Sequence, residues 1–183
     1  MKYFLDCGSN LGQGFTHFRN IYGDGYQYLL FEPNVNCYEK LVENFNILTN
    51  VTIFNAAVYT SDCVKTFRFD SSYSVGGTLV EQHNSAFPKK QEEVAVRCID
   101  IIRMVDTIIS NGNEVVMKLD VESSEYDILE KMIETKTINK IKKIYCEFHT
   151  QYMIPEDRKA FLPRENSILN YIRENKLDFE IWH

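Results

Sequence analysis

Four side chains that can exchange protons or bind cations end two apolar runs in the second half of the chain. Asp120 and Glu122 end the first run. Glu147 and His149 end the second. Carboxylates beside an imidazole can act as a general base with its orienting partner, or hold a hard divalent cation. These four residues are our candidate catalytic group.

A glycine-rich turn near the N-terminus has the residue types of a ligand cradle. The stretch FLDCGSNLGQG leaves an apolar run at Asp6 and has the pattern acid-x-G-x-x-x-G through Gly8 and Gly12. Glycine lets the backbone approach a ligand closely, and the N–H groups of a following helix point at it. The dinucleotide pattern G-x-G-x-x-G is broken, because Asn10 and Gln13 replace its second and third glycines.

A further acid, Glu32, ends the apolar run YQYLLFEP. At the carboxyl edge of a parallel sheet, such a carboxylate can accept two hydrogen bonds from a ribose diol. A solvated acid at a strand end is the alternative. Together with the glycine-rich turn, Glu32 predicts a ligand that contains a nucleoside.

The apolar pattern also predicts the elements that position these residues. Apolar periodicity predicts strands at 2–7, 26–33 and 51–58 and helices at 13–22 and 35–45, which gives the order β-α-β-α-β. Continuous apolar strands between helices are typical of a parallel sheet covered on both faces, the α/β class.

Residues 60–98 interrupt this order. The runs at 64–70 and 93–99 alternate like half-exposed strands, which predicts a β-hairpin with a long loop inserted in a single domain. Glycines at 76–77 predict the hinge of a lid that closes over a bound substrate. A surface hairpin without a catalytic role is the alternative.

The rest of the chain returns to helices and strands. We predict a helix capped by Asp100 that ends near Ser110, strands at 114–122 and 141–149 with a helix between them, a polar loop at 150–166, a helix near 167–175 and a short last strand, DFEIWH. The parallel strands bring the four catalytic candidates to one sheet edge. One domain, 1–183, accounts for all of these elements.

Composition narrows the class of protein. The chain has 183 residues, 44% hydrophobic and 25% charged, as in a globular domain. The net charge of −6 argues against nucleic acid as a partner. We expect no membrane span and no leader, and the five unpaired cysteines favour a cytoplasmic protein.

Several motifs together resemble the FkbM family of S-adenosylmethionine-dependent methyltransferases over about residues 3–149. They are FLDCGSNLGQG, FEPN, NAAV, MKLDVESSEYDILEKM and IYCEFH. The most specific family motif is lysine, an apolar residue, Asp-Val-Glu-Gly-x-Glu, matched here by Lys118, Asp120, Val121, Glu122 and Glu125. Ser123 or Ser124 stands where the family usually has glycine, so the turn must be made differently.

The resemblance implies a Rossmann-like class I methyltransferase fold with S-adenosylmethionine as cofactor. That fold normally ends in an antiparallel pair of strands, so one last strand predicts a shortened sheet edge. The family mostly works without metal, so we assign no metal ligand, and whether a metal binds stays open. The cofactor site implied by the resemblance consists of Asp6, Gly8, Ser9, Asn10 and Gly12 for the methionine end, Glu32 for the ribose, Asn55, Ala56 and Ala57 for the adenine, and Asp120.

The family implies O-methylation of a hydroxyl on a sugar or another small molecule, with His149 as a candidate base. One alternative is methylation of an RNA ribose 2′-hydroxyl, for which Lys118 lies close to Asp120 but should sit too deep. Another is a cofactor-binding module without catalysis. We expect residues 60–98 and 150–166 to select the acceptor and His83 to be solvated. The acceptor itself and the oligomeric state stay open.

Overall fold

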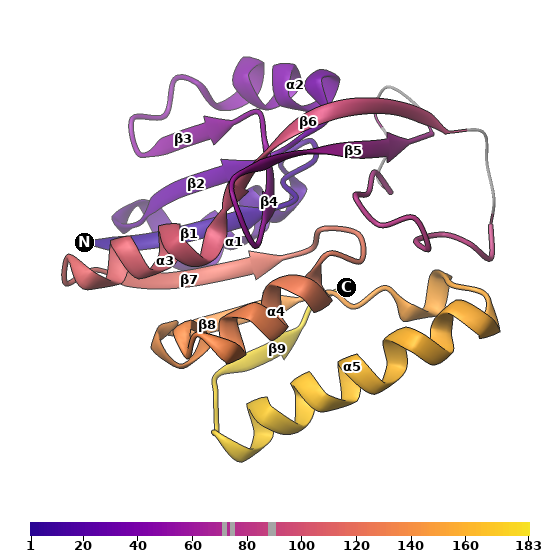
Figure 1. The fold of residues 1–183 in the computed structure, drawn as a ribbon. Helices are drawn as coiled ribbons and strands as arrows, with labels where there is room; N and C mark the ends of the chain where they lie inside the picture. Colours follow the sequence, from indigo (N-terminus) through magenta and orange to yellow (C-terminus); the bar gives the residue numbers. More distant parts are fainter. Residues whose placement is uncertain (71–72, 74–75, 88–90) are drawn as a thin grey trace.

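The main sheet of the computed structural model, which describes residues 1–70, 73, 76–87 and 91–183, is six-stranded and has the order β3-β2-β1-β7-β8-β9 (Figure 1). Every neighbouring pair of strands is parallel. Its strands are β1 (Lys2–Cys7), β2 (Gln27–Phe31), β3 (Val51–Phe54), β7 (Glu114–Leu119), β8 (Lys143–Cys146) and β9 (Phe179–Ile181). The predicted parallel sheet is therefore confirmed.

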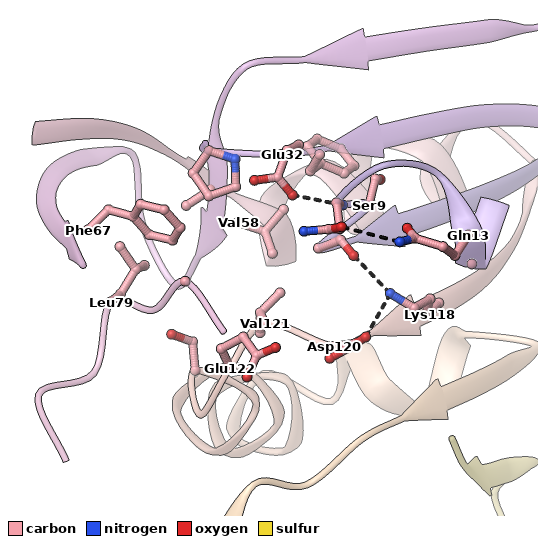
Figure 2. A pocket seen from close by; sticks show the side chains of 18 of the residues that line it. Ser9, Gln13, Glu32, Val58, Phe67, Leu79, Lys118, Asp120, Val121 and Glu122 are labelled. Carbon is pink, nitrogen blue, oxygen red and sulfur yellow. Dashed lines mark hydrogen bonds and ion pairs between the residues drawn. The ribbon is translucent and has the colours of Figure 1, made fainter. Parts of the chain in front are cut away.

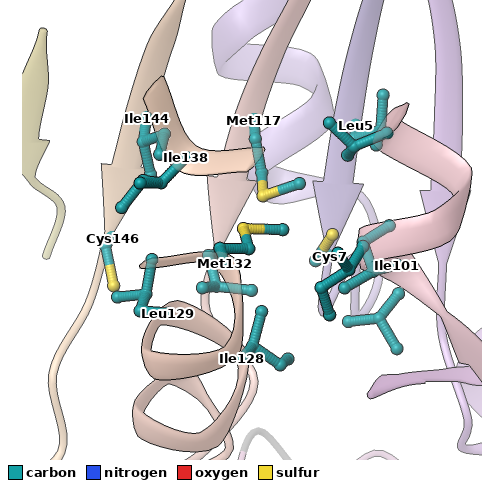
Figure 3. Close-up of a cluster of buried hydrophobic side chains, with 14 of the residues drawn as sticks. Leu5, Cys7, Ile101, Met117, Ile128, Leu129, Met132, Ile138, Ile144 and Cys146 are labelled. Atoms are coloured by element: carbon teal, nitrogen blue, oxygen red, sulfur yellow. The ribbon is translucent and has the colours of Figure 1, made fainter. Parts of the chain in front are cut away.

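Helices pack on both faces of this sheet, because successive side chains of a strand point to opposite sides. Phe4 of β1 belongs to an aromatic-rich cluster under α1 (Gln13–Tyr22) and α2 (Val35–Phe45). Leu5 faces the other way, into the cluster under α3 (Ile101–Ser110), α4 (Glu125–Glu134) and α5 (Pro155–Glu174). Figure 3 shows Met117 of the sheet beside Met132 of α4, and Leu5 and Ile128 belong to the same cluster. The arrangement is the predicted Rossmann-like α/β fold.

Short turns complete these layers. They are the 3-10 helices Gly23–Gly25, Thr137–Lys140 and Thr150–Tyr152. The predicted cap of α3 is confirmed, since the side chain of Asp100 accepts a hydrogen bond from the N–H of Arg103 at 2.9 Å. In the described part of the chain, no helix is both long and apolar enough to cross a membrane.

A small second sheet has the order β4-β6-β5 and consists of β4 (Ala57–Tyr59), β5 (Cys63–Phe69) and β6 (Glu92–Asp100). Strands β5 and β6 pair antiparallel, which confirms the predicted hairpin. Residues 71–72, 74–75 and 88–90 of its long connection lie outside the described residues. The predicted strand 51–58 is wrong as one element, because the chain changes sheets at Asn55.

Three boundaries differ from prediction. Strand β7 ends at Leu119 and β8 ends at Cys146, so all four catalytic candidates lie in the loops that follow these strands. The predicted loop at 150–166 is mostly helix, because α5 begins at Pro155 and continues through Pro163. At the other edge of the sheet, β9 pairs parallel with β8 as the predicted single last strand.

Candidate active site

The turn after β1 is held by hydrogen bonds within the protein. Gly8 and Ser9 both donate their N–H groups to the carbonyl of Phe31, at 3.1 and 3.0 Å. Asn10 donates to Glu32 Oε2 at 2.8 Å, and the next two N–H groups also have acceptors in the turn. The N–H groups of the turn itself, from Gly8 to Gly12, are therefore already paired.

Gly8 is required by its backbone conformation and by its neighbour. Its φ is +81°, in the left-handed region, and a Cβ there would lie 1.8 Å from the carbonyl oxygen of Asp120. Glycine thus lets the turn after β1 pass directly against the turn after β7.

Glu32 is almost completely buried at the end of β2, with 5% of its surface exposed. Its Oε1 accepts from the N–H of Asn34 at 2.7 Å, while Oε2 accepts from Asn10. Burial raises the pKa of Glu32 to about 7, although both N–H groups lower it. Each carboxylate oxygen keeps a second lone pair that can accept a hydroxyl.

Lys118 is a buried cation that joins the two turns. It lies beside Asp6 in the register of β7 with β1, and its Nζ is 3.3 Å from Asp6 Oδ1. The same Nζ is 3.1 Å from Asp120 Oδ2 and donates to the carbonyl of Gly8 at 2.9 Å (Figure 2). Burial lowers the pKa of Lys118, but the two acids raise it above its ordinary value. Lys118 is therefore an ammonium ion at neutral pH.

A cavity of about 260 Å³ lies between these turns and the inserted hairpin. Figure 2 shows Phe67 and Leu79 on the opposite side of the cavity from Gln13 and Lys118. Ser124 also lines it, and the buried hydroxyl of Ser124 has no hydrogen-bond partner among the described residues. The cavity thus has an apolar side and a charged side.

The predicted cofactor residues divide into those in the cavity wall and those behind it. In the wall are Gly8, Ser9, Asn10, Glu32, Ala57 and Asp120. Asp6 lies beneath the wall against Lys118, and Gly12 packs near Phe45. Ala56 is buried in the core, and Asn55 is exposed, its amide donating to the carbonyls of Glu32 and Pro33.

A second cavity, of about 570 Å³, is lined by all four predicted catalytic residues. His83 and Tyr152 also line it. Asp120 and Glu122 line both cavities. One end of the sheet therefore presents two spaces that share two carboxylates.

The four catalytic candidates meet around the buried ring of His149. Its Nε2 is 3.2 Å from Glu122 Oε2, 3.6 Å from Asp120 Oδ1 and 3.9 Å from Glu147 Oε1. On the other side, Nδ1 is 3.2 Å from Glu125 Oε1. Burial lowers the pKa of His149, but Glu125, Glu122 and Asp120 together raise it to about 10. In this arrangement the imidazole holds its proton at neutral pH.

The turn after β7 has left-handed backbone at two residues that are not glycine. The φ angles are 53° at Glu122 and 81° at Ser123, the position of the glycine in the resembled motif. The hydroxyl of Ser123 is 2.9 Å from His83 Nδ1, and Thr78 Oγ1 donates to the carbonyl of Glu122. Serine therefore makes the tight turn in the conformation of glycine, and the insertion holds the turn in place.

Sequence reasoning missed several residues of the site. His83 is 3% exposed, so its expected solvation is wrong. A lone histidine in a polar stretch gave no signal of burial. Lys118 was expected to sit deep, but only the register of β1 with β7 shows that it faces Asp6. Phe67 and Leu79 enter the cavity because the hairpin folds back over the sheet edge.

Comparison with known proteins gives one family. A model described as the methyltransferase FkbM domain matches residues 6–176. No curated protein matches the chain. Among solved structures, the chain is similar to a crystal structure of a yeast methylglyoxal/isovaleraldehyde reductase complexed with NADPH, at 9% identity and a TM-score of 0.49. That similarity covers 99% of this chain but 56% of the reductase, and at these values it carries no argument about function.

Proposed function

The chain belongs to the FkbM methyltransferase family, and we propose that it transfers the methyl group of S-adenosylmethionine to a hydroxyl of a sugar or another small molecule. One observation carries this proposal: Asp120 and Glu122 line both cavities. A transferase needs two binding spaces that meet where the group is transferred. The smaller cavity is our cofactor site and the larger one our acceptor site.

The charges of the smaller cavity suit S-adenosylmethionine. This cofactor carries a sulfonium and an ammonium against one carboxylate. Among the described residues of the wall, the acids Glu32, Asp120 and Glu122 outnumber the one cation, Lys118. A pyrophosphate would instead meet these acids and turn N–H groups that are already paired. The residues therefore fit a cationic cofactor better than a dinucleotide.

The smaller cavity offers suitable protein groups for each part of the cofactor. Glu32 would accept the ribose hydroxyls with the lone pairs that its N–H partners leave. The methionine end would lie against the turn after β1, near Ser9 and Asn10. The adenine would lie against Val58 and Phe67 of the apolar side.

The bound cofactor supplies an electrophilic methyl group with a good leaving group. The protein then has to hold the acceptor oxygen about 3 Å from the methyl carbon and exclude water. Glu122 and Glu147 are the candidate bases for the hydroxyl proton, since both face the acceptor cavity. His149 would orient these carboxylates rather than remove the proton, because it is already protonated.

The two alternatives predicted from the sequence gain no support from the site. An RNA methyltransferase of the lysine type needs a lysine that reaches the hydroxyl. Lys118 is 3% exposed and is held between Asp6 and Asp120. A module without catalysis would not need the second cavity, which is lined by all four candidate catalytic side chains.

A methyl-labelled cofactor tests the proposal. Purified protein is incubated with it and with separate pools of sugars, small polyhydroxylated molecules and RNA. We expect label in one of the first two pools. We also expect Asp120→Asn to abolish transfer, while Glu39→Gln on the exposed surface of α2 does not. Label in RNA alone, or cofactor binding without transfer to any pool, would contradict the proposal.

A further inference from the structure

We propose that the acceptor cavity contains a divalent cation site formed by Asp120, Glu122 and His149. The role of this cation in methyl transfer rests on the proposed function, but cation binding itself does not. The proposal departs from the assignment, drawn from family resemblance, of no metal ligand.

The three side chains already have nearly the spacing of a metal centre. One oxygen or nitrogen atom from each lies within 4.8 Å of the others. Ligands bound to one ion at about 2.0–2.2 Å lie about 3 Å apart when adjacent and about 4.4 Å apart when opposite. A movement of a few tenths of an ångström would therefore close the site.

Asp120 lines both cavities, and its two carboxylate oxygens have different neighbours. Oδ2 faces Lys118 at 3.1 Å, and Oδ1 faces His149 Nε2 at 3.6 Å. A cation held by Oδ1 would therefore sit on the acceptor side of the shared wall. The ammonium of Lys118 would fix the other oxygen of the same carboxylate.

The ring of His149 has a carboxylate beside its second nitrogen. Its Nδ1 lies 3.2 Å from Oε1 of the buried Glu125, a close ion-pair contact that lacks hydrogen-bond geometry, and Glu125 Oε1 accepts from the N–H of Val121 at 2.6 Å. Histidines that bind metals usually donate their other ring N–H to a carboxylate, which orients the ring. The contact leaves Nε2 directed at Asp120 and Glu122, and a cation bound there would displace the Nε2 proton to solvent.

A second histidine points into the same group from the insertion. His83 is 3% exposed, and its Nδ1 is placed by Ser123. Its Nε2 is 3.0 Å from Glu122 Oε2 but forms no hydrogen bond with the part of the chain that the structure describes. A buried nitrogen without such a bond is costly unless something binds it. A cation beside Glu122 would lie within reach of this atom.

The mixed ligand set indicates the class of cation. Magnesium and calcium prefer sites made only of oxygen, whereas carboxylates combined with imidazole suit manganese, iron or zinc. Nothing in methyl transfer requires a redox change, so we infer a divalent ion that acts as a Lewis acid. Manganese(II) is the probe that fits these ligands and can be read directly.

In the reaction, the cation would bind the acceptor oxygen and lower the pKa of the hydroxyl. The O–H bond breaks and its proton passes to Glu147, which lines the same cavity. The oxygen then forms a bond to the methyl carbon, the carbon–sulfur bond breaks, and its electron pair stays on sulfur as a thioether. No oxidant or reductant is needed.

A titration of manganese(II) into the full chain tests the site. The chain is first treated with a chelator, no cofactor is added, and the electron paramagnetic resonance signal of the free ion measures how much has bound. We expect one bound ion per chain and a raised melting temperature. Asp120→Asn and His149→Gln should abolish binding. Glu125→Gln should weaken it about 10–100-fold, as for other partners of metal-bound histidines. Glu81→Gln, an exposed acid of the insertion, should bind like the wild type.

Circular dichroism of each variant separates a lost ligand from a lost fold, and Asp120→Asn and Glu125→Gln each keep the size of the side chain. Absent manganese binding in the folded wild type, or equal binding in Asp120→Asn, would overturn the proposal. Zinc that displaces manganese at one site would support it.

A separate calorimetric titration with S-adenosylmethionine keeps the two proposals apart. Manganese bound without any cofactor binding would retain the cation site and overturn the proposed function. Cofactor binding and transfer that both survive a chelator would overturn the catalytic role of the cation.

Discussion

The turn after β1 and the turn after β7 touch each other but differ in how their polar groups are satisfied. From Gly8 to Gly12, each backbone N–H has an acceptor within the protein. Around the turn after β7, buried atoms of Ser124, Glu125 and His83 form no hydrogen bond within the described chain. That turn also has two consecutive left-handed residues that are not glycine, Glu122 and Ser123, whereas the turn after β1 has one, Asn10.

This difference separates a scaffold from a reactive site. The backbone N–H groups of the first turn are paired without a ligand, although the two carboxylate oxygens of buried Asp6 beneath it form no hydrogen bond within the described chain. The role of this turn is to place Glu32. The second turn carries strain and unpaired polar atoms, which cost free energy and persist where the surrounding structure imposes them. Such features are typical of positions that a ligand completes.

The largest expected effect comes from removing the cation that joins the turns. Lys118→Met leaves Asp6 buried without its partner, which should lower the free energy of unfolding by about 3–5 kcal/mol. Adding Asp6→Asn should restore part of this loss. Urea unfolding of both variants measures the effect, and a double mutant no more stable than Lys118→Met would show that the two residues are not coupled.

The contact between the turns is tested by a pair of glycine substitutions. Gly8→Ala adds a methyl group against the carbonyl of Asp120, whereas Gly112, with φ +75°, has no atom within 4 Å of its Cβ position. Both variants place alanine in the left-handed backbone region and share that conformational cost. Gly8→Ala should therefore be the less stable by a further ~2–3 kcal/mol, the typical cost of overpacking. Equal losses would mean that the turns can separate freely.

The pKa of Glu32 predicts how cofactor binding depends on pH. This carboxyl has a pKa of about 7 in the protein, and ribose hydroxyls would bind its ionised form. Affinity should rise with pH from 6 to 8, by up to about tenfold per unit below the pKa. Calorimetry at several pH values measures this slope. The slope should disappear in Glu32→Gln, and a slope of opposite sign would exclude the ionised form.

The same shift has an opposite effect on stability. Burial raises the pKa of Glu32 above its unfolded value of 4.5, so the folded protein holds the extra proton between that pH and about 7. The contribution of this group to stability is therefore greatest at low pH and falls as pH rises through this window. Thermal melts at several pH values, compared between the wild type and Glu32→Gln, separate the contribution of Glu32 from that of the other carboxyls.

The smallest effect concerns the strain at Ser123. Ser123→Gly and Ser123→Ala both remove the hydroxyl that contacts His83, and they differ only by a methyl group on left-handed backbone. The glycine variant should be about 1 kcal/mol more stable than the alanine variant. Chemical unfolding resolves this difference. A more stable alanine variant would show that the turn is not strained.

The sequence predicted the fold well where periodicity decides it. Apolar runs and the helical stripe placed β1, α1, β2 and α2, and Asp100 marked the start of α3. The mostly apolar stretch 51–58 does not show that the chain changes sheets at Asn55, whose amide donates to two carbonyls of the neighbouring loop. The polar stretch 150–166 predicted a loop, but buried Phe161 and Ile168 on either side of Pro163 hold α5 together.

The site was predicted where strand ends carry acids, and missed where the insertion contributes. Parallel strands necessarily bring Asp120 and Glu147 to one edge. Nothing in the polar stretch indicates that His83 and Thr78 fold back onto the turn after β7. Such contacts depend on how a long connection packs, which residue spacing does not encode.

Titration of S-adenosylmethionine, and separately of NAD, into the purified chain tests the central claim most directly. Wild type and Glu39→Gln should bind S-adenosylmethionine with micromolar affinity. Glu32→Gln should bind about 10–100-fold more weakly, the loss expected for a charged hydrogen-bond acceptor, while its melting curve shows a folded protein. Tight binding of NAD, or S-adenosylmethionine affinity unchanged in Glu32→Gln, would contradict the assignment of the smaller cavity.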